Sequence, residues 1–428
     1  MTKRYSGWRV VAGSAVGMGF SMQMFIATGF TFLAAALSKA FGWTLIEVAA
    51  GATFYLLGQV IGFPLAGTLL DRFGTRRVVT LGICGVALLM LVLSRIQALW
   101  QLYACLFAMG IVGALGYTIS YLRALVLWFD RRRGVAIGVA ASGLAFGGVI
   151  YPFATERIIS MTGWSAVPLA IAALQLLVVL PWVLALVRDS PAPYGLAADG
   201  RPLGEPVPPR RAQAGAVSSA QACSLTLGQA LHTIDFWMLA TVYLVGGAAV
   251  YGLITNSVHI LWYTASLKTA EVAKVQAVAG ITLLLGRPLG GFLLDRVGTR
   301  TVAIAMTLLT AVGILGYAWG DRLGTVMIAA FVLGLATGGE GDVLPYMTAK
   351  YFGPESFGKI YGVLAAFFAV GTAIGPLAYA SLATLMDSPT KPLMVMSGAT
   401  MAASFCFLFV GRRDLPTTVR AITTGGIS

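Results

Sequence analysis

Charged side chains are scarce in this chain. Lys, Arg, Asp and Glu make up 11% of its 428 residues, whereas hydrophobic residues make up 58%. A soluble globular protein carries about a quarter charged residues, and it could not cover this much apolar surface. The composition therefore excludes an ordinary soluble fold and predicts a chain whose main solvent is lipid.

Side chains that bind metals or perform covalent catalysis are also few. The chain has 2 histidines and 4 cysteines, and none of them forms a CxxC motif or a His/Cys cluster. We therefore expect no metal, no cofactor and no disulfide framework, and we expect the thiols to be buried. No nucleophile–base constellation is evident, so the chain is not expected to be an enzyme. The first apolar run is too long for the core of a cleavable signal peptide.

The apolar residues fall into a series of runs with few or no charges. A helix needs about 20 residues to cross the hydrocarbon core, and each run is long enough, or nearly so once its flanks are included. The 12 runs are 10–38, 48–70, 78–94, 96–122, 134–155, 158–187, 236–267, 275–294, 301–320, 323–349, 360–386 and 392–411. The sequence predicts an all-α integral membrane protein with 12 transmembrane helices.

Half of these runs lie on each side of a polar stretch between Arg188 and Asp235. The density of proline in this stretch indicates a linker rather than a packed domain. The predicted organisation is an N-terminal six-helix bundle (1–187), a cytoplasmic linker (188–235), a C-terminal six-helix bundle (236–411) and a cytoplasmic tail (412–428).

Lysine and arginine are distributed unevenly between the two sets of loops. With the N-terminus inside, the cytoplasmic segments carry 20 of these residues and the outer segments carry 7. Because cytoplasmic loops carry the excess of Lys and Arg, both termini are predicted to be cytoplasmic. The formal net charge of +13 then reflects topology, and its spread over short loops argues against nucleic-acid binding.

One charged phrase occurs twice in the chain. GTLLDRFGTRR (67–77) has a near copy, GFLLDRVGTRT (291–301), half a chain away. The offset from the first copy to the second also relates Glu47 to Glu271, Pro64 to Pro288 and further pairs of Gly and Pro. The two halves are therefore predicted to be pseudo-symmetric copies of one six-helix unit, an organisation that is typical of a rocking transporter.

The repeated phrase resembles the loop signature of the major facilitator superfamily. More narrowly, the chain resembles bacterial members of the monocarboxylate transporter family. The supporting phrases are SGWRVVAG (6–13), WFDRRRGVAIGVAASG (128–143), RDSPAPYGLAADG (188–200), GRPLGG (286–291) and GGEGDVLPYMTAKYFG (338–353). The resemblance implies a multi-pass protein of the bacterial inner membrane, for which a monomer would suffice.

The resemblance also implies that the repeated loop latches the cytoplasmic face closed in the outward-open state. Its aspartates are expected to cap a neighbouring helix N-terminus or to pair with basic loop residues, and its glycines permit close approach and a sharp turn. The alternative, positive-inside topology alone, explains the arginines but neither the aspartates nor the glycines. The predicted gate residues are Gly67, Asp71, Arg72, Gly74, Arg76, Asp295, Arg296, Gly298 and Arg300.

Arg287 is the main candidate for substrate binding. It lies eight residues before Asp295, which places it roughly 12 Å along the helix at about 1.5 Å per residue. A charge so deep in the membrane usually faces a water-filled cavity, and a guanidinium matches a carboxylate. The alternative is a structural ion pair. The resemblance implies a substrate-contacting arginine here, although Leu283 and Ile26 stand where the animal family members have an acid and a lysine.

Three further charged residues are predicted to lie inside the membrane. Glu340 and Asp342 are expected to serve proton coupling or gating, or to form a static buried pair, and one of them is expected to pair with Arg123 or Arg287. Arg123 is expected to snorkel towards the cytoplasmic interface, with an anion contact or an inner gate as the alternative. Other candidates for the substrate path are Tyr117, Tyr121, Asn256, His259 and Phe367, each of which could instead serve packing or the membrane interface.

These observations predict a secondary transporter with one central site that is open alternately to each side. The expected substrate is a small organic monocarboxylate similar to lactate or pyruvate, clamped by Arg287 and moved with a proton. A dicarboxylate or anion exchanger, which would use Arg123 as a second cation, is an alternative, and an exporter of drugs or organic cations through Glu340 and Asp342 is another. A membrane sensor or enzyme would need a soluble or catalytic module that the sequence does not contain.

Overall fold

The computed structural model describes residues 7–202 and 225–411. Within them, 12 helical segments are long and apolar enough to cross a membrane, so the predicted all-α membrane fold is confirmed. Seven spans contain a single helix, namely α4 (Leu45–Phe73), α5 (Thr75–Leu93), α8 (Arg133–Thr162), α12 (Ile234–Ala265), α13 (Thr269–Arg296), α14 (Thr299–Trp319) and α17 (Phe357–Leu385).

The other spans are assembled from shorter pieces. The first is α1 (Gly7–Gly19), α2 (Met22–Met24), η1 (Phe25–Gly29) and α3 (Phe30–Phe41), and the sixth is α9 (Ala166–Leu174), η3 (Gln175–Val179) and α10 (Leu180–Leu186). The fourth is α6 (Leu99–Gly113), η2 (Ala114–Gly116) and α7 (Thr118–Trp128), the tenth is α15 (Leu323–Glu340) and α16 (Val343–Tyr351), and the last is α18 (Lys391–Ser404) and α19 (Cys406–Phe409).

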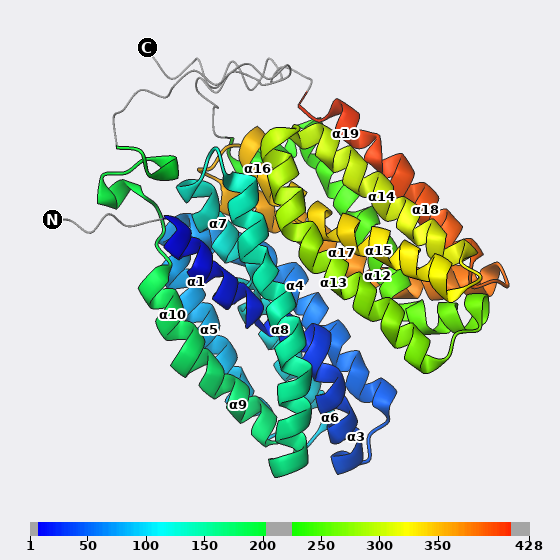
Figure 1. The fold of residues 1–428 in the computed structure, drawn as a ribbon. Coiled ribbons are helices and arrows are strands. Elements are labelled where there is room, and N and C mark those ends of the chain that lie inside the picture. The colour runs from blue at the N-terminus through cyan, green and yellow to red at the C-terminus, as the bar shows by residue number, and fades with distance from the viewer. Residues whose placement is uncertain (1–6, 203–224, 412–428) are drawn as a thin grey trace.

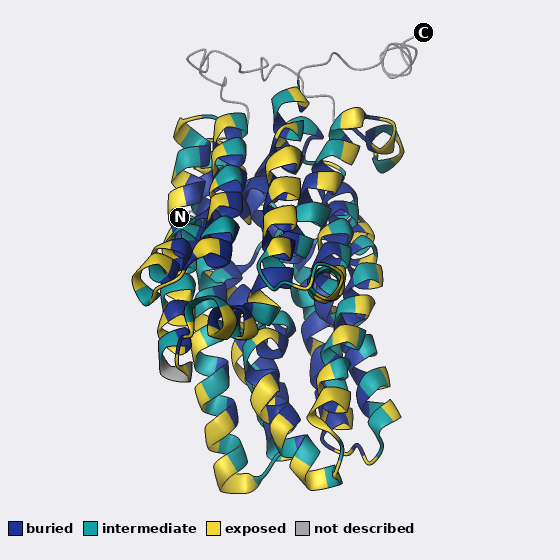
Figure 2. Cartoon of the chain, turned by 90° about the vertical axis from the view of Figure 1, so that its right-hand side faces the viewer, coloured by how far each residue is buried: buried dark blue, intermediate teal, exposed yellow. Residues whose placement is uncertain are grey.

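The spans form two bundles, one from α1 to α10 and one from α12 to α19 (Figure 1). The bundles lie together at the end where residues 188–202 leave the first bundle, which we call the linker end, and they diverge at the opposite end, which we call the loop end (Figure 1). Exposed residues run along the outer faces of the helices, and buried residues gather where helices meet (Figure 2). Large exposed side chains such as Phe153 and Leu177 are hydrophobic, as expected for a surface in contact with lipid.

Helices approach one another closely at several glycines. At the loop-end side, α8 and α17 lie against the first helix of their own bundle. A Cβ atom on Gly147 would lie 1.7 Å from the carbonyl oxygen of Gly19, and a Cβ atom on Gly375 would lie 2.3 Å from that of Ala248. Small residues permit this separation of backbones in a membrane, where helix association depends on close packing rather than on the hydrophobic effect.

The segment after the sixth span differs from a simple linker. It contains two short helical turns, η4 (Ala192–Tyr194) and η5 (Ala198–Gly200), and one antiparallel bridge between Leu196 and Pro202. The Asp189 carboxylate accepts a hydrogen bond of 2.8 Å from the Arg76 backbone N–H, and the Asp199 carboxylate accepts one of 2.9 Å from that of Arg131. Residues 188–202 therefore pack on the first bundle, and α11 (Leu227–Leu231) precedes the seventh span.

The prediction that the thiols are buried holds for Cys105 but not for Cys84, which is exposed on the outer face of α5, and Cys406 is intermediate. Cys223 lies outside the described residues.

The glycine contacts generate a test of packing. We expect Gly147→Ala to lower the thermal unfolding temperature of the purified protein in detergent, because overpacking against a backbone typically costs about 1–3 kcal/mol. The matched control is Gly280→Ala, since a Cβ atom at this helical position would meet nothing within 4 Å. Equal unfolding temperatures for the two variants would contradict the described contact between α8 and α1.

Candidate functional site

Two carboxylates at the linker end each bind the opposite bundle. The Asp71 carboxylate, at the end of α4, accepts hydrogen bonds from the backbone N–H groups of Gly358 (3.1 Å) and Lys359 (2.9 Å) at the start of α17. The Asp295 carboxylate, at the end of α13, accepts them from Gly134 (2.9 Å) and Val135 (3.0 Å) at the start of α8. Each negative charge thus meets the positive end of a helix from the opposite bundle.

These two contacts are equivalent in the internal repeat. Asp71 corresponds to Asp295 and Gly134 corresponds to Gly358, at the same offset in the sequence. Glycines let the backbones cross beside them. A Cβ atom on Gly67 would lie 2.0 Å from the carbonyl oxygen of Gly358, and one on Gly291 would lie 2.1 Å from that of Gly134. The expected aspartate caps are therefore present and close the linker end symmetrically.

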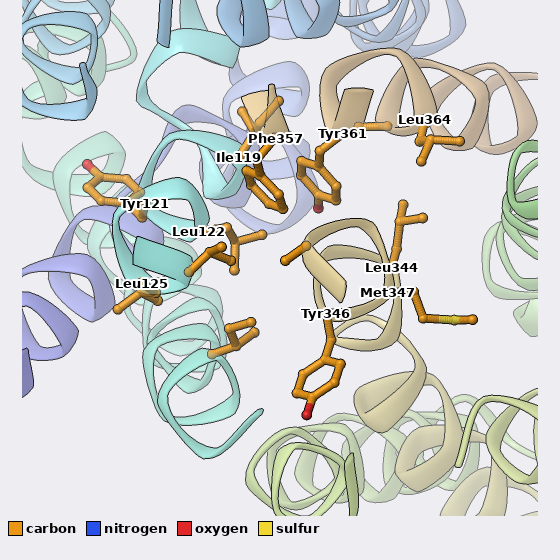
Figure 3. Packing of buried hydrophobic residues seen from close by; sticks show 14 of the residues in the cluster. Ile119, Tyr121, Leu122, Leu125, Leu344, Tyr346, Met347, Phe357, Tyr361 and Leu364 are labelled. Atoms are coloured by element: carbon orange, nitrogen blue, oxygen red, sulfur yellow. The ribbon is translucent and has the colours of Figure 1, made fainter. Parts of the chain in front are cut away.

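Buried side chains fill the space between the bundles just inside this contact. Ile119 and Leu122 on α7 face Phe357 and Tyr361 on α17, with Leu344 on α16 beside them (Figure 3). The rings of Phe357 and Tyr361 stack at 5.3 Å between centroids. This apolar layer separates the linker end from the centre of the molecule.

A cavity of about 230 Å³ lies on the far side of the layer, between the bundles. Both bundles line it, mainly with aromatic and aliphatic side chains. The lining includes Phe63, Tyr117, Thr118, Ile119, Leu144, Tyr243, Gly246, Tyr251, Ile254, Leu283, Arg287, Thr337, Glu340, Gly341, Leu344, Tyr361 and Phe368. Ile254 is 50% exposed and Phe368 is 36% exposed, whereas Ile119 is 1% exposed, so the cavity is accessible from the loop end and closed at the linker end.

Arg287 carries the positive charge in this cavity. Its Nη1 atom lies 3.0 Å from Oδ1 of Asp342, and the exposed fractions of the two side chains are 17% and 2%. Gly341 makes room for the guanidinium, because a Cβ atom there would lie 2.9 Å from Nη1. Among the described residues, Nη1 is the guanidinium nitrogen that donates a hydrogen bond. The buried Nε atom of Arg287 and the buried Oδ2 atom of Asp342 have no hydrogen-bond partner among these residues.

Glu340 lines the cavity two residues before Asp342 but has different partners. Its carboxylate accepts hydrogen bonds from the Thr307 hydroxyl (3.1 Å) and the Thr310 hydroxyl (2.8 Å), both on α14. The residue is 9% exposed. The two acids separate because α15 ends at Glu340 and α16 begins at Val343, so the chain changes direction between them.

The fourth and tenth spans are both interrupted at the cavity. The break before α7 places Tyr117 in an extended conformation, and the break before α16 lies at Gly341 and Asp342. Tyr117 and Gly341 are separated by the same offset as the two copies of the repeated phrase, so the two breaks are equivalent in the repeat. Binding sites of transporters typically lie at such discontinuous helices, whose exposed N-terminal ends attract anionic groups.

Comparison with known proteins identifies the family. The sequence profile of the Major Facilitator Superfamily matches residues 12–266 and 257–425. The chain belongs to the Major Facilitator Superfamily. The transporter is similar to the MFS transporter asaE of Aspergillus flavus (27% identity, 82% of this chain and 74% of the relative), to the uncharacterised MFS-type transporter YhjX of Escherichia coli (23%, 79% and 79%) and to the agnestins efflux protein AgnL12 of Paecilomyces divaricatus (25%, 82% and 75%).

The fold also matches a solved structure. The human organic anion transporter MFSD10 superposes with a TM-score of 0.72 at 16% identity, covering 94% of this chain and 99% of that one. At this identity the likeness concerns the fold alone. The matched profile describes the whole superfamily, so the narrower resemblance to monocarboxylate transporters stays a prediction.

The structure places the predicted substrate residues in different environments. Arg287 and Tyr117 line the cavity of the transporter, together with Glu340. Tyr121 does not line it, because its ring is buried against α1, where a Cβ atom on Gly17 would lie 2.1 Å from the hydroxyl. Phe367 also lies elsewhere, with its ring 5.9 Å from that of Trp237, whereas the adjacent Phe368 lines the cavity.

Two further candidates on α12 also lie outside the lining. The Asn256 side chain donates to the carbonyl oxygen of Gly252 in its own helix (2.9 Å), and His259 is exposed one turn farther towards the loop end. Sequence reasoning did not select Tyr243, Tyr251 and Tyr361, which do line the cavity. The alignment of the two halves could not have found them, because the residues at the equivalent positions in the first half, Gly19, Ala27 and Ile137, are not aromatic.

Arg123 forms an ion pair that the predicted snorkelling did not include. It reaches towards the linker end, but it ends in a salt bridge with Asp71 (Nε to Oδ1, 3.2 Å) with an exposed fraction of 13%, rather than in solvent. The predicted snorkelling is therefore wrong, because the Asp71 carboxylate already lies where the guanidinium would reach the interface. Arg123 belongs to the contact between the bundles and not to the cavity.

The remaining gate candidates serve the turns themselves. Gly74 and Gly298 have φ angles of 81° and 112°, which favour glycine. Arg72 lies over the ring of Phe73, Arg296 lies over that of Phe292, and the Arg300 side chain donates to the carbonyl oxygen of Val410. The backbone N–H of Arg76 binds Asp189. In residues 7–202 and 225–411, no group of three His, Cys, Asp or Glu side chains could hold a metal ion.

The crossed carboxylates generate a test of the closed linker end. In Asp71→Asn/Asp295→Asn we expect the linker end to open more often, because each change removes a charge–helix interaction of about 0.3–2 kcal/mol. The measurement is the distance between spin labels at Arg131→Cys and Val297→Cys in an otherwise cysteine-free protein. Asp321→Asn, at an exposed loop-end site, is the control, and an unchanged distance distribution in the double variant would contradict the role of the carboxylates.

Proposed function

We propose that the transporter carries a small organic monocarboxylate, similar to lactate or pyruvate, together with a proton. The observation that carries this proposal is the guanidinium of Arg287 in the central cavity, where Asp342 engages Nη1 and leaves Nη2 for a ligand. A guanidinium binds a carboxylate with directed, charge-assisted hydrogen bonds. A positive side chain at this depth in a membrane protein marks a substrate pathway by default.

The broken helices support an anionic substrate. α7 begins at Thr118 and α16 at Val343, so both half-helices start at the cavity and run towards the linker end. Their N-terminal N–H groups and helix dipoles add a positive potential to the charge of Arg287. Two independent sources of positive potential thus converge on the same space.

The cavity dimensions support a small substrate. Its volume of about 230 Å³ lies below the range of roughly 300–1,000 Å³ that is typical for drug-sized ligands. Aromatic and aliphatic side chains form most of the wall, and they suit the apolar part of a short organic acid. A monocarboxylate offers one charged group for Arg287 and an uncharged remainder for this wall.

The closed linker end supports alternating access. We infer that the linker end faces the cytoplasm of a bacterial cell, so that the described conformation is outward-open with both termini inside. Asp71 and Asp295 would then release the starts of α17 and α8 when the bundles rock and the cavity opens inward. The Phe357–Tyr361 stack would separate from α7 in the same step.

A second candidate is the efflux of an organic molecule. Relatives of this chain include an agnestins efflux protein and a multidrug resistance protein, and Glu340 could attract a cation. In contrast, the dicarboxylate alternative loses its second cation, because Arg123 pairs with Asp71 outside the cavity.

Ligand-dependent stability tests the proposed substrate class. We expect lactate or pyruvate to raise the thermal unfolding temperature of the wild-type protein, because a ligand at 100 times its Kd stabilises the folded state by about 2.7 kcal/mol. The shift should vanish in Arg287→Ala. Arg322→Ala, which removes an arginine with 84% side-chain exposure, should retain it.

The same panel would include succinate and the cation tetraphenylphosphonium. Stabilisation by the cation alone, unchanged in Arg287→Ala, would contradict the monocarboxylate proposal and would favour Glu340 and Asp342 as the substrate site.

A further inference from the structure

Glu340 is the acidic side chain in the cavity that lacks a cationic partner among the described residues. Its two oxygens accept hydrogen bonds from Thr307 and Thr310, whereas the Asp342 carboxylate is paired with Arg287. Glu340 lines the cavity together with Gly246 on the opposite wall, and a Cβ atom on Gly246 would lie 3.5 Å from Oε1 of Glu340. The carboxyl group therefore faces the cavity.

The net charge of the cavity depends on this one group. Arg287 and Asp342 neutralise each other, and the other titratable side chains of the lining are tyrosines: Tyr117 on α7, Tyr243 and Tyr251 on α12, and Tyr361 on α17. Tyrosine is uncharged near neutral pH. The lining is thus neutral when Glu340 is protonated and carries one negative charge when Glu340 is ionised.

We propose that Glu340 is the proton-binding site of the transport cycle and that its protonation permits the anion to bind at Arg287. This inference rests on the proposed function. An anion that enters while Glu340 is ionised meets an uncompensated negative charge between mainly apolar walls, which screen the repulsion of like charges poorly. Binding of the proton and of the anion therefore favour each other, and each changes the affinity of the other by the same factor.

The local chemistry suits both protonation states of Glu340. A threonine hydroxyl can donate or accept, and it rotates to do so. Thr307 and Thr310 can therefore both donate to the carboxylate, and either one can accept from the carboxylic acid. Proton uptake at this site needs no movement of the backbone.

Asp342 is less suited to the same task. Protonation of Asp342 would remove the charge that compensates Arg287, and an incompletely paired buried charge is costly. We infer that Asp342 instead holds the Arg287 guanidinium in place until the substrate carboxylate arrives.

The experiment measures the pH dependence of binding. In wild-type protein, the affinity for lactate or pyruvate should rise by up to about tenfold for each unit of pH decrease in the range where Glu340 titrates. Glu340→Gln, which imitates the protonated form, should bind the probe with an affinity that does not change with pH. Glu156→Gln, which changes an exposed acid on α8, should behave like wild type.

A second variant keeps the carboxyl group. Thr307→Val/Thr310→Val removes both hydroxyl partners of Glu340, and it should move the pH at which the affinity changes. An unchanged pH profile in this variant, or a Glu340→Gln variant that retains the wild-type profile, would overturn the assignment and direct attention to Asp342.

An infrared titration without ligand separates this inference from the proposed function. The absorption of a protonated carboxyl group should appear on acidification in wild type and Glu156→Gln, and its amplitude should fall in Glu340→Gln. Failure of lactate and pyruvate to bind would reject the monocarboxylate while leaving this infrared signal intact. An infrared titration that is the same in Glu340→Gln and wild type would reject Glu340 as the proton site.

Discussion

A charged side chain inside these bundles needs stabilising contacts from another helix, because lipid offers none. This constraint ties the functional parts of the transporter together. The guanidinium of Arg287 on α13 is compensated by Asp342 at the start of α16, and Arg123 on α7 is compensated by Asp71 at the end of α4. The Asp71 carboxylate also binds the start of α17. The same side chain therefore compensates the charge of Arg123 and joins the two bundles.

The repeat distinguishes the contacts between the bundles from the charged residues of the cavity. The two aspartate–helix contacts at the linker end obey the offset between the two halves, as a movement shared by two equivalent bundles requires. The cavity breaks the symmetry. The positions equivalent to Arg287, Glu340 and Asp342 in the first half are Phe63, Gly116 and Thr118. The second bundle therefore supplies the charges, while the first supplies apolar and hydroxyl-bearing wall, so the proposed sites of substrate and proton both lie on the side of the second bundle.

Much of this arrangement could be predicted from the sequence. The apolar runs indicated the spans, and the distance of Arg287 from Asp295 placed it in the interior. The partners of the two acids could not be chosen, because the choice depends on the chain break at Gly341, which turns Glu340 towards α14 and Asp342 towards α13. The rotation of each helix about its axis could not be predicted from the sequence either. One residue changes the direction of a side chain by about 100° on a helix of 3.6 residues per turn, and this difference separates Phe367 from Phe368.

The polar stretch after the sixth span shows a different limit. Its prolines predicted a linker, and composition alone carries no sign that Asp189 binds the backbone at the start of α5 or that Asp199 binds the backbone just before α8. Such contacts depend on the ends of helices that are distant in the sequence and meet only in the folded bundle. They connect residues 188–202 to the same face that Asp71 and Asp295 close.

The central claim is that Arg287 binds the carboxylate of a substrate that crosses the membrane through this cavity. The most direct measurement is uptake of labelled lactate and pyruvate into sealed liposomes under an inward proton gradient, with wild-type protein, with an equal amount of Arg287→Ala and without protein. We predict accumulation of at least one label with wild-type protein and the protein-free level with Arg287→Ala. Equal accumulation in the two proteins, or none with wild type, would contradict this claim.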